Sequence, residues 1–331
     1  MSSRSRDIIA HTLAAAGVYP AEMYCVAQSG TAPFAYWKDW FDADKWGSDI
    51  ATVFDLTTEG RNDTILLMPG RYIQTASIDW DKDNVHLVGL GGSNHPFDYG
   101  HTEACIIYAT TASAIAQVLH VTSTAKNCQF HNIMVQNNSA NAGSLCALKV
   151  DAGMATFKGC SFAGIMNSTQ MAVAAASSVY IHSNAGGYKF EDCIIGDDLW
   201  QTRTTAYQAN GVRFTATGWP RPYNGIFKRC WFRSNATGEH CGSVGWGATN
   251  SSQWFHVFDN CLFTNFVEFA TTQPLAVFTL PANPRTTFVV LRNGTTEVGW
   301  QEWQIDNYEL MFNSDMPDAH ASGGIVCEPT G

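Results

Sequence analysis

A short frame that recurs around five cysteines restricts the fold of this 331-residue sequence more than any other feature. Cysteine stands fourth in each six-residue copy, and successive cysteines are 32, 33, 37 and 31 residues apart. Self-similarity at such a period indicates a solenoid, in which each repeat buries its apolar face by stacking on its neighbours. The copies read AKNCQF at Cys128, FKGCSF at Cys160, FEDCII at Cys193, FKRCWF at Cys230 and FDNCLF at Cys261. Two weaker copies, KDNVHL and LRNGTT, place Val85 and Gly294 in the cysteine position.

The frame predicts a corner between two strands. Side chains alternate along a strand, so the cysteine and the apolar residue two places later point the same way. If the alternation continued backwards, unpaired charges such as Lys158 and Glu191 would be buried, which costs too much free energy. We therefore expect a two-residue corner directly before the cysteine. Its second residue is Asn, Asp or Gly, which tolerate a left-handed backbone, in every copy except the one with Arg229.

A second set of alternating segments recurs at the same period, at 118–121, 147–150, 179–182, 212–215, 244–247 and 276–280. Two strands, a fixed corner and a third side of variable length make one coil, and stacked coils lie about 4.8 Å apart. The prediction is an all-β, right-handed parallel β-helix in which the five frame cysteines stack in register. We expect these cysteines to be reduced packing residues, because ladder positions rarely offer tetrahedral geometry and no Cys-x-x-Cys pair occurs.

We expect three parts along the chain: an N-terminal helix with an aromatic-rich cap at 1–60, the β-helix at 61–298, and a C-terminal cap or tail at 299–331. An open solenoid end exposes core and unpaired backbone and must be covered. A docking surface is the alternative for the N-terminal segment, since aromatic residues are enriched in interfaces. The aromatic residues concerned are Phe34, Tyr36, Trp37, Trp40, Phe41 and Trp46.

Composition excludes two classes of partner. The formal net charge is −10, and basic residues form no stripe, which argues against nucleic acid or an anionic membrane. No apolar run approaches the ~20 residues of a membrane-spanning helix. The N-terminus has the layout of a secretory leader, but Asp7 and His11 interrupt its apolar stretch, so we expect a short helix there.

The stretch ILLMPGRYIQ…WDKDNVHLVGLGG (65–92) resembles the opening coil of pectin-lyase-like right-handed β-helix proteins, where a PG-x-Y hairpin precedes the first full coil. The opening KDN-x-HLVGLGG, the F-x-x-C-x-F rungs and the Gly-rich tail from Gly323 to Thr330 are together most similar to β-helix proteins of tailed-phage virions. The resemblance covers roughly 65–331. It implies the β-helix fold and a place in a phage particle.

The resemblance also implies candidate catalytic residues, because the superfamily includes polysaccharide lyases and glycoside hydrolases. Gly196-Asp197-Asp198 resembles the paired aspartates of polygalacturonase-like hydrolases, and two carboxylates about 5–9 Å apart can act as acid and base or nucleophile. That family's Gly-His-Gly element has only Gly238-Glu239-His240 as a counterpart, which departs from it, and its Arg-x-Lys clamp has none. Asp197, Asp198 and His240 are therefore candidates with incomplete partners, and Asp197 and Asp198 also suit a solvated turn. We expect no cofactor and no metal, and structural roles for histidines such as His120, His182 and His256.

The sequence thus favours a non-catalytic component of a tailed-phage particle, such as a capsid decoration or minor capsid protein. Its expected partners are the major capsid protein or other virion proteins, and its expected state is a homotrimer. Reduced cysteines suit assembly in the bacterial host cytoplasm and a virion location. Two alternatives remain: a polysaccharide-degrading enzyme such as a phage depolymerase, and an adhesin that binds host-surface glycan without cleaving it.

Overall fold

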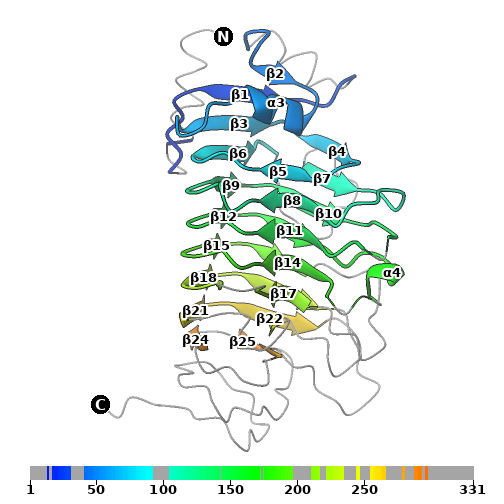
Figure 1. The fold of residues 1–331 in the computed structure, drawn as a ribbon, viewed down its shortest axis with the longest axis vertical. Helices are drawn as coiled ribbons and strands as arrows, with labels where there is room; N and C mark the ends of the chain where they lie inside the picture. The colour runs from blue at the N-terminus through cyan, green and yellow to red at the C-terminus, as the bar shows by residue number, and fades with distance from the viewer. Residues whose placement is uncertain are drawn as a thin grey trace, which may run out of the picture.

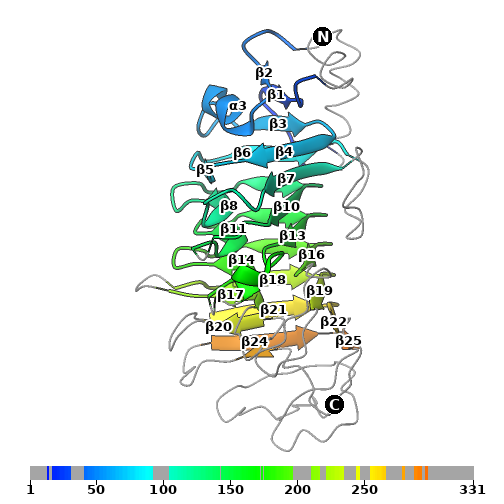
Figure 2. The ribbon, with the colours of Figure 1, turned by 90° about the vertical axis from the view of Figure 1, so that its right-hand side faces the viewer.

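Stacked three-stranded coils form the molecule, and strands of successive coils pair in parallel into three long sheets (Figures 1 and 2). Within a coil the chain passes through sheet C, then sheet A, then sheet B. The chain is a right-handed parallel β-helix, as the repeat predicts. The computed structural model describes residues 13–14, 17–30, 41–91, 104–141, 143–171, 173, 175–196, 210–216, 221–234, 244–246, 254–265, 278–279, 287–292 and 295–296.

Sheet A contains, in spatial order, β2 (Trp46–Gly47), β1 (Met23–Val26), β3 (Asp63–Leu67), β6 (Val85–Gly89), β9 (Gln129–His131), β12 (Thr156–Lys158), β15 (Lys189–Glu191), β18 (Gly225–Lys228), β21 (Trp254–Asp259) and β24 (Thr287–Arg292). Sheet B contains β4 (Gly70–Gln74), β7 (Cys105–Ala109), β10 (Met134–Asn137), β13 (Ser161–Ala163), β16 (Ile194–Ile195), β19 (Trp231–Ser234), β22 (Leu262–Asn265) and β25 (Thr295–Thr296). Sheet C contains β5 (Ile78–Trp80), β8 (Gln117–Val121), β11 (Cys146–Val150), β14 (Ser177–Ile181), β17 (Asn210–Phe214), β20 (Val244–Trp246) and β23 (Phe278–Thr279).

Sheet C is the second strand set that the sequence predicts, and the variable part of each coil is the connection from sheet B to sheet C. One such connection carries the short helix α4 (Ser168–Met171). No helix in the described ranges is long and apolar enough to cross a membrane.

Both corners that flank sheet A place one residue in the left-handed region. At the corner from A to B these residues have φ between 52° and 62°: Asn132, Gly159, Asp192, Arg229 and Asn260, of which the last four are at predicted positions. At the corner from C to A the values lie between 50° and 64°: Asn84, Asn127, Met154, Gly187 and Asn224. Asn fits both corners, because its short polar side chain tolerates this conformation.

The shared corner chemistry explains one wrong prediction, the place of Cys128. Phe130 pairs with Phe157, and the Ser161 N–H bonds to the Ile133 carbonyl, so Ile133 occupies the position equivalent to Cys160. Cys128 follows the corner from C to A, one corner earlier in the coil, and Val85 lies at the same corner. The sequence Lys-Asn-Cys resembles the corner from A to B, because both corners need a residue that adopts the left-handed backbone conformation.

The remaining four frame cysteines, Cys160, Cys193, Cys230 and Cys261, form the predicted internal ladder. Each thiol donates to the backbone carbonyl of a phenylalanine in the preceding coil, at sulfur–oxygen distances of 3.3–3.5 Å. Complete burial raises the pKa of the Cys160 and Cys230 thiols, which keeps them neutral. The eight cysteines that the structure describes are all buried and free of disulfides.

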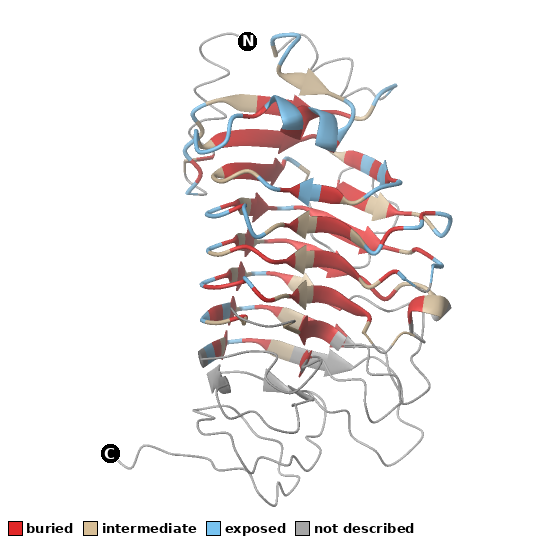
Figure 3. Ribbon diagram, viewed as in Figure 1, coloured by how far each residue is buried: buried red, intermediate tan, exposed pale blue. Residues whose placement is uncertain are grey.

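A stack of phenylalanine rings fills the core beside this ladder. Adjacent ring centroids lie 4.6–5.0 Å apart, with interplanar angles of 4–15°, along Phe130, Phe157, Phe190, Phe227 and Phe258. The rings are fully buried, and the exposed residues gather at corners and loops (Figure 3). Offset stacking of this kind adds about 0.5–1.5 kcal/mol per pair beyond the burial of apolar area.

Helix α3 (Ile50–Leu56) covers the N-terminal end of this stack. Its Phe54 ring lies 4.3 Å from the ring of Trp80, which meets Phe130 edge-on. Within 1–60, β1 also extends sheet A, and a second apolar cluster including Leu13, Cys25 and Leu66 covers that sheet's outer face. The boundaries at 60 and 298 stay predictions. Residues 31–40 and the segment after 296, including the predicted tail, lie outside the described residues.

Candidate functional site

The aspartates and the histidine that the sequence singles out, Asp197, Asp198 and His240, lie outside the described residues. The structure therefore neither brings them together nor separates them. The described coils contain a different group of titratable side chains, on the outer face of sheet C.

Two columns of polar residues follow that outer face from coil to coil. The first column has one member per coil in direct register: Asp79, His120, Lys149, Tyr180 and Arg213. Flanking residues such as Leu119 and Val121 point into the core, so alternation turns this column outward. A second column lies two residues later, where the N–H groups of Asp151 and His182 continue the same inter-coil ladder.

Asp151 is the centre at which three coils meet. Its Oδ1 lies 2.5 Å from His182 Nδ1, and its Oδ2 lies 3.1 Å from His120 Nε2 and 3.0 Å from Lys149 Nζ. The three donors come from the coil before, the same coil and the coil after. Because several donors share one carboxylate, its position and rotamer are tightly defined.

These contacts decide the protonation of Asp151. Partial burial acts to raise its pKa, but the hydrogen bonds from His120, His182 and Lys149 outweigh burial and hold the pKa well below its usual range. Asp151 is therefore an ionised acceptor at any ordinary pH and cannot serve as a proton donor.

The ionised carboxylate also fixes the tautomer of His182. Its Nδ1 must carry a proton to bond to Asp151, so the lone pair of the neutral ring lies on Nε2. The structure gives this Nε2 no partner among the described residues. The ring of Tyr180 lies nearly parallel to the imidazole, with centroids 6.1 Å apart. His120 lies between two carboxylates, because its Nδ1 is 3.3 Å from Asp79 Oδ1.

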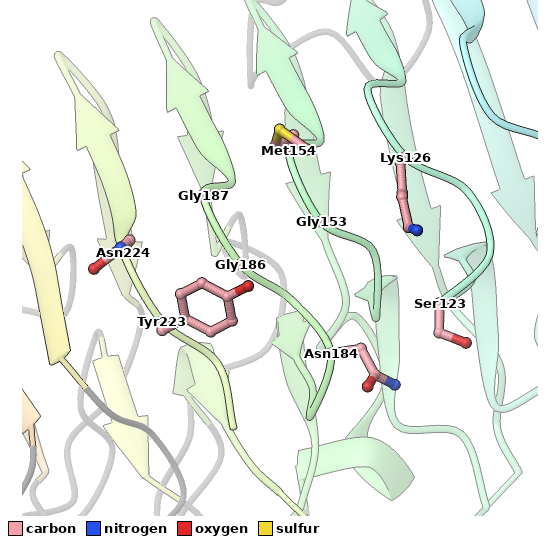
Figure 4. A pocket seen from close by; sticks show the side chains of 9 residues that line it. All are labelled: Ser123, Lys126, Gly153, Met154, Asn184, Gly186, Gly187, Tyr223 and Asn224. Atoms are coloured by element: carbon pink, nitrogen blue, oxygen red, sulfur yellow. The ribbon is translucent and has the colours of Figure 1, made fainter. Parts of the chain in front are cut away.

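An open cleft of about 680 Å³ lies immediately beyond this cluster, at the corner from sheet C to sheet A. Gly153 follows Asp151 by two residues and Asn184 follows His182 by two, so the same coils supply both features. Figure 4 shows the side chains along the cleft, of which one is basic and several are polar: Ser123, Lys126, Met154, Asn184, Tyr223 and Asn224.

The floor of the cleft depends on a glycine. The ring of Tyr223 lies against the backbone of Gly186 in the neighbouring coil, where an added Cβ would come within 2.2 Å of the ring (Figure 4). Gly153, Gly186 and Tyr223 are joined by isolated parallel bridges. The bridged backbone and the Tyr223 ring form one side of the cleft, which Lys126 also lines.

The composition of the cluster differs from that of a typical metal site. Within the described ranges, no three or more His, Cys, Asp or Glu side chains are arranged to hold an ion. Around Asp151 the third donor is the Lys149 ammonium, which takes the place that a cation would need.

Sequence reasoning missed this group because it assessed His120 and His182 one at a time and assigned them structural roles. The signal was present in the predicted strands at 118–121, 147–150 and 179–182, whose alignment places His120 beside Lys149. Asp151 comes beside His182 only in the observed register, which pairs Leu148 with Val179 and so differs by one residue from an alignment of the predicted segment starts.

Comparison with known proteins shows which solved structures have a similar fold. No family model and no curated protein matches this chain. A pectin methylesterase solved in complex with a hexasaccharide superposes with a TM-score of 0.54 over 91% of each chain, at 14% identity. This likeness shows the parallel β-helix fold. Pectin methylesterase from carrot gives a TM-score of 0.52 at 15% identity, covering 92% of this chain and 86% of the other.

A viral protein is among the similar structures. ORF18 of Geobacillus virus E2 gives a TM-score of 0.37 at 12% identity, covering 76% of this chain and 59% of the other. That likeness is too distant to bear on the source of the chain. The resemblance at 65–92 thus predicts the fold correctly, and the origin in a phage particle stays a prediction.

Proposed function

We propose that this chain is a polysaccharide-acting β-helix, and that it hydrolyses an ester carried by a glycan at the Asp151 cluster and the adjoining cleft. This takes up the alternative of a glycan-directed protein in place of the non-catalytic capsid role. The observation that carries the proposal is the convergence of three coils on Asp151, two residues before the chain of these coils reaches an open cleft.

The chemistry of the cluster favours ester hydrolysis over cleavage of a glycosidic bond. Glycosidases need two carboxyl groups, one of which must hold a proton to give to the leaving oxygen. Asp151 cannot hold that proton, because its hydrogen bonds keep its pKa well below the usual range. A carboxylate-bound imidazole instead suits attack of water on an acyl carbon. Structural neighbours that are pectin methylesterases agree with an ester substrate.

The cleft supplies groups that recognise sugars. Ser123, Asn184 and Asn224 can each donate and accept hydrogen bonds to hydroxyl groups, and Lys126 adds a positive charge. The opening lies on the side of the stacked coils, where an extended chain can run along the helix axis. A cleft with a few converging polar groups is the usual form of a small-ligand site.

The test is a release assay on esterified glycans. The purified protein is incubated with methyl-esterified polygalacturonate and with O-acetylated polysaccharides, and free methanol and acetate are measured. Reducing ends and unsaturated uronides are followed in parallel. We expect ester release without chain cleavage, strongly reduced by Asp151→Asn. Chain cleavage without ester release would contradict the assignment, as would a protein that releases nothing and binds none of these glycans.

A second function is supported by the sequence, namely a place in a tailed-phage particle. The segment at 65–92, the cysteine frame and the tail resemble virion β-helices, and reduced buried cysteines suit assembly in a bacterial cytoplasm. An ester-hydrolysing β-helix on a particle would act on the glycan of the host surface, so the two functions are compatible. Mass spectrometry of purified source particles tests this location, and light scattering tests the expected trimer.

A further inference from the structure

The Asp151 carboxylate is anchored more firmly than a single structural ion pair requires. His120 and Lys149 both bond to Oδ2, which leaves Oδ1 to His182 alone. The side chain of Asp151 is only 11% exposed, whereas the first-column neighbour Asp79 is 61% exposed. One oxygen is therefore held by two donors while the other is aimed at a single imidazole.

From this geometry we propose that His182 is the general base of the ester-hydrolysing site and that Asp151 is its positioning residue. The inference rests on the proposed function and deepens it. A general base needs a free nitrogen, a fixed tautomer and access to solvent, and His182 has all three, its side chain being 18% exposed. The carboxylate on the opposite nitrogen supplies orientation, as in other carboxylate–histidine pairs.

The proposed step is balanced with water as the second reactant. His182 Nε2 accepts a proton from a water molecule as the water oxygen bonds to the ester carbonyl carbon, which gives a tetrahedral intermediate and an imidazolium. The carbon–oxygen bond to the leaving alcohol then breaks, and the alcohol oxygen takes the proton from Nε2. A carboxylic acid and an alcohol are released, His182 is neutral again, and Asp151 stays ionised throughout.

The surroundings of His182 favour its acting as a base. The groups that face it are Asp151 at Nδ1 and the ring of Tyr180, with Lys149 and His120 on the far oxygen of Asp151. Arg213 pairs in register with Tyr180 on the next coil. The negative charge of Asp151 stabilises the imidazolium that forms when His182 accepts the proton of water, so removing that charge should slow the reaction.

Three matched variants test the assignment: His182→Gln, Asp151→Asn and His131→Gln. The last replaces an imidazole on the outer face of sheet A, away from the cluster. Circular dichroism and thermal unfolding establish which variants fold. We expect His182→Gln to lower kcat at least 100-fold with KM unchanged within about threefold, because general-base catalysis contributes about 10²–10⁴-fold. Asp151→Asn should lower kcat with KM little changed and should loosen the Nδ1 tautomer of His182 in nitrogen-15 NMR, and His131→Gln should behave as wild type.

The outcomes separate this inference from the proposed function. If wild type releases ester and His182→Gln keeps kcat within twofold, the general-base role is overturned while the esterase function stands. If wild type releases no ester, the proposed function itself fails. Nitrogen-15 NMR of the wild-type protein adds a measurement that needs no variant. A His182 ring with its proton on Nδ1 supports the assignment, and a proton on Nε2 overturns it.

Discussion

Gly225 gives the sharpest prediction about packing inside the coils. A Cβ at this position would lie 2.0 Å from Cζ and 2.1 Å from the hydroxyl oxygen of Tyr188, whose side chain is fully buried. The Tyr188 ring passes over Gly225 to reach His256, and its hydroxyl lies 2.8 Å from His256 Nδ1. The Tyr188 ring cannot move away from Gly225 without breaking its hydrogen bond to His256 inside an apolar core. Gly225→Ala therefore forces a choice between a clash and a lost hydrogen bond.

The expected cost follows from these two terms. Overpacking a core costs about 1–3 kcal/mol, and leaving a buried partner without its hydrogen bond costs about 1–3 kcal/mol. Because the variant must bear one cost or the other, we expect Gly225→Ala to lower the free energy of unfolding by about 1–3 kcal/mol, a substantial part of the ~5–15 kcal/mol typical of a domain. Urea unfolding followed by tryptophan fluorescence measures the change as a lower midpoint.

The chain offers a matched control in Gly153. A Cβ there would meet only the Gly186 carbonyl oxygen, at 3.7 Å, so Gly153→Ala should change the stability by less than about 0.5 kcal/mol. In a double-mutant cycle, Tyr188→Val should remove most of the penalty of Gly225→Ala. Equal midpoints for Gly225→Ala and Gly153→Ala would refute the packing argument.

Three further predictions concern titration, thiols and a corner. Burial lowers the pKa of His86 and of His131 to about 4 and of His256 to about 3, so each binds a proton less readily in the folded state than in the unfolded state. The free energy of unfolding should therefore fall as pH drops from 6.5 towards 4, by up to ~3 kcal/mol per histidine, as measured by urea unfolding at several pH values. Cys160, Cys193, Cys230 and Cys261 should not react with a thiol reagent until denaturant unfolds the chain, and rapid labelling of any of the four in the native protein, located by peptide mapping, would contradict a buried, neutral ladder. Arg229→Gly should be more stable than Arg229→Ala by about 1 kcal/mol in thermal unfolding. Both variants lose the ion pairs to Asp192 and Glu191, but only glycine adopts the positive φ of 52° without strain.

The sequence predicts the coil well because only a few residue types suit its corners. A buried charge is costly, so the charged pair before Cys160 or Cys193 must turn outward, and the residue next to it must accept a left-handed backbone. The same reasoning misplaces Cys128, because the corner from C to A demands the same backbone and also carries an asparagine. Only the inter-coil register distinguishes the two corners, and register depends on loop lengths that local patterns leave undetermined.

The candidate site was harder to predict for a related reason. His120, Asp151 and His182 are 31 residues apart along the chain, and no local motif joins them. They meet only because parallel coils align equivalent positions. The aligned strands contained this information, but it becomes visible only when the residues are compared between coils.

A crystal structure of the wild-type protein with an esterified oligosaccharide tests the central claim most directly. The account predicts sugar in the cleft between Lys126, Asn184 and Tyr223, with the ester carbonyl carbon next to His182 Nε2. Sugar bound at Asp197 and Asp198 instead, with the Asp151 cluster and the cleft empty, would contradict it.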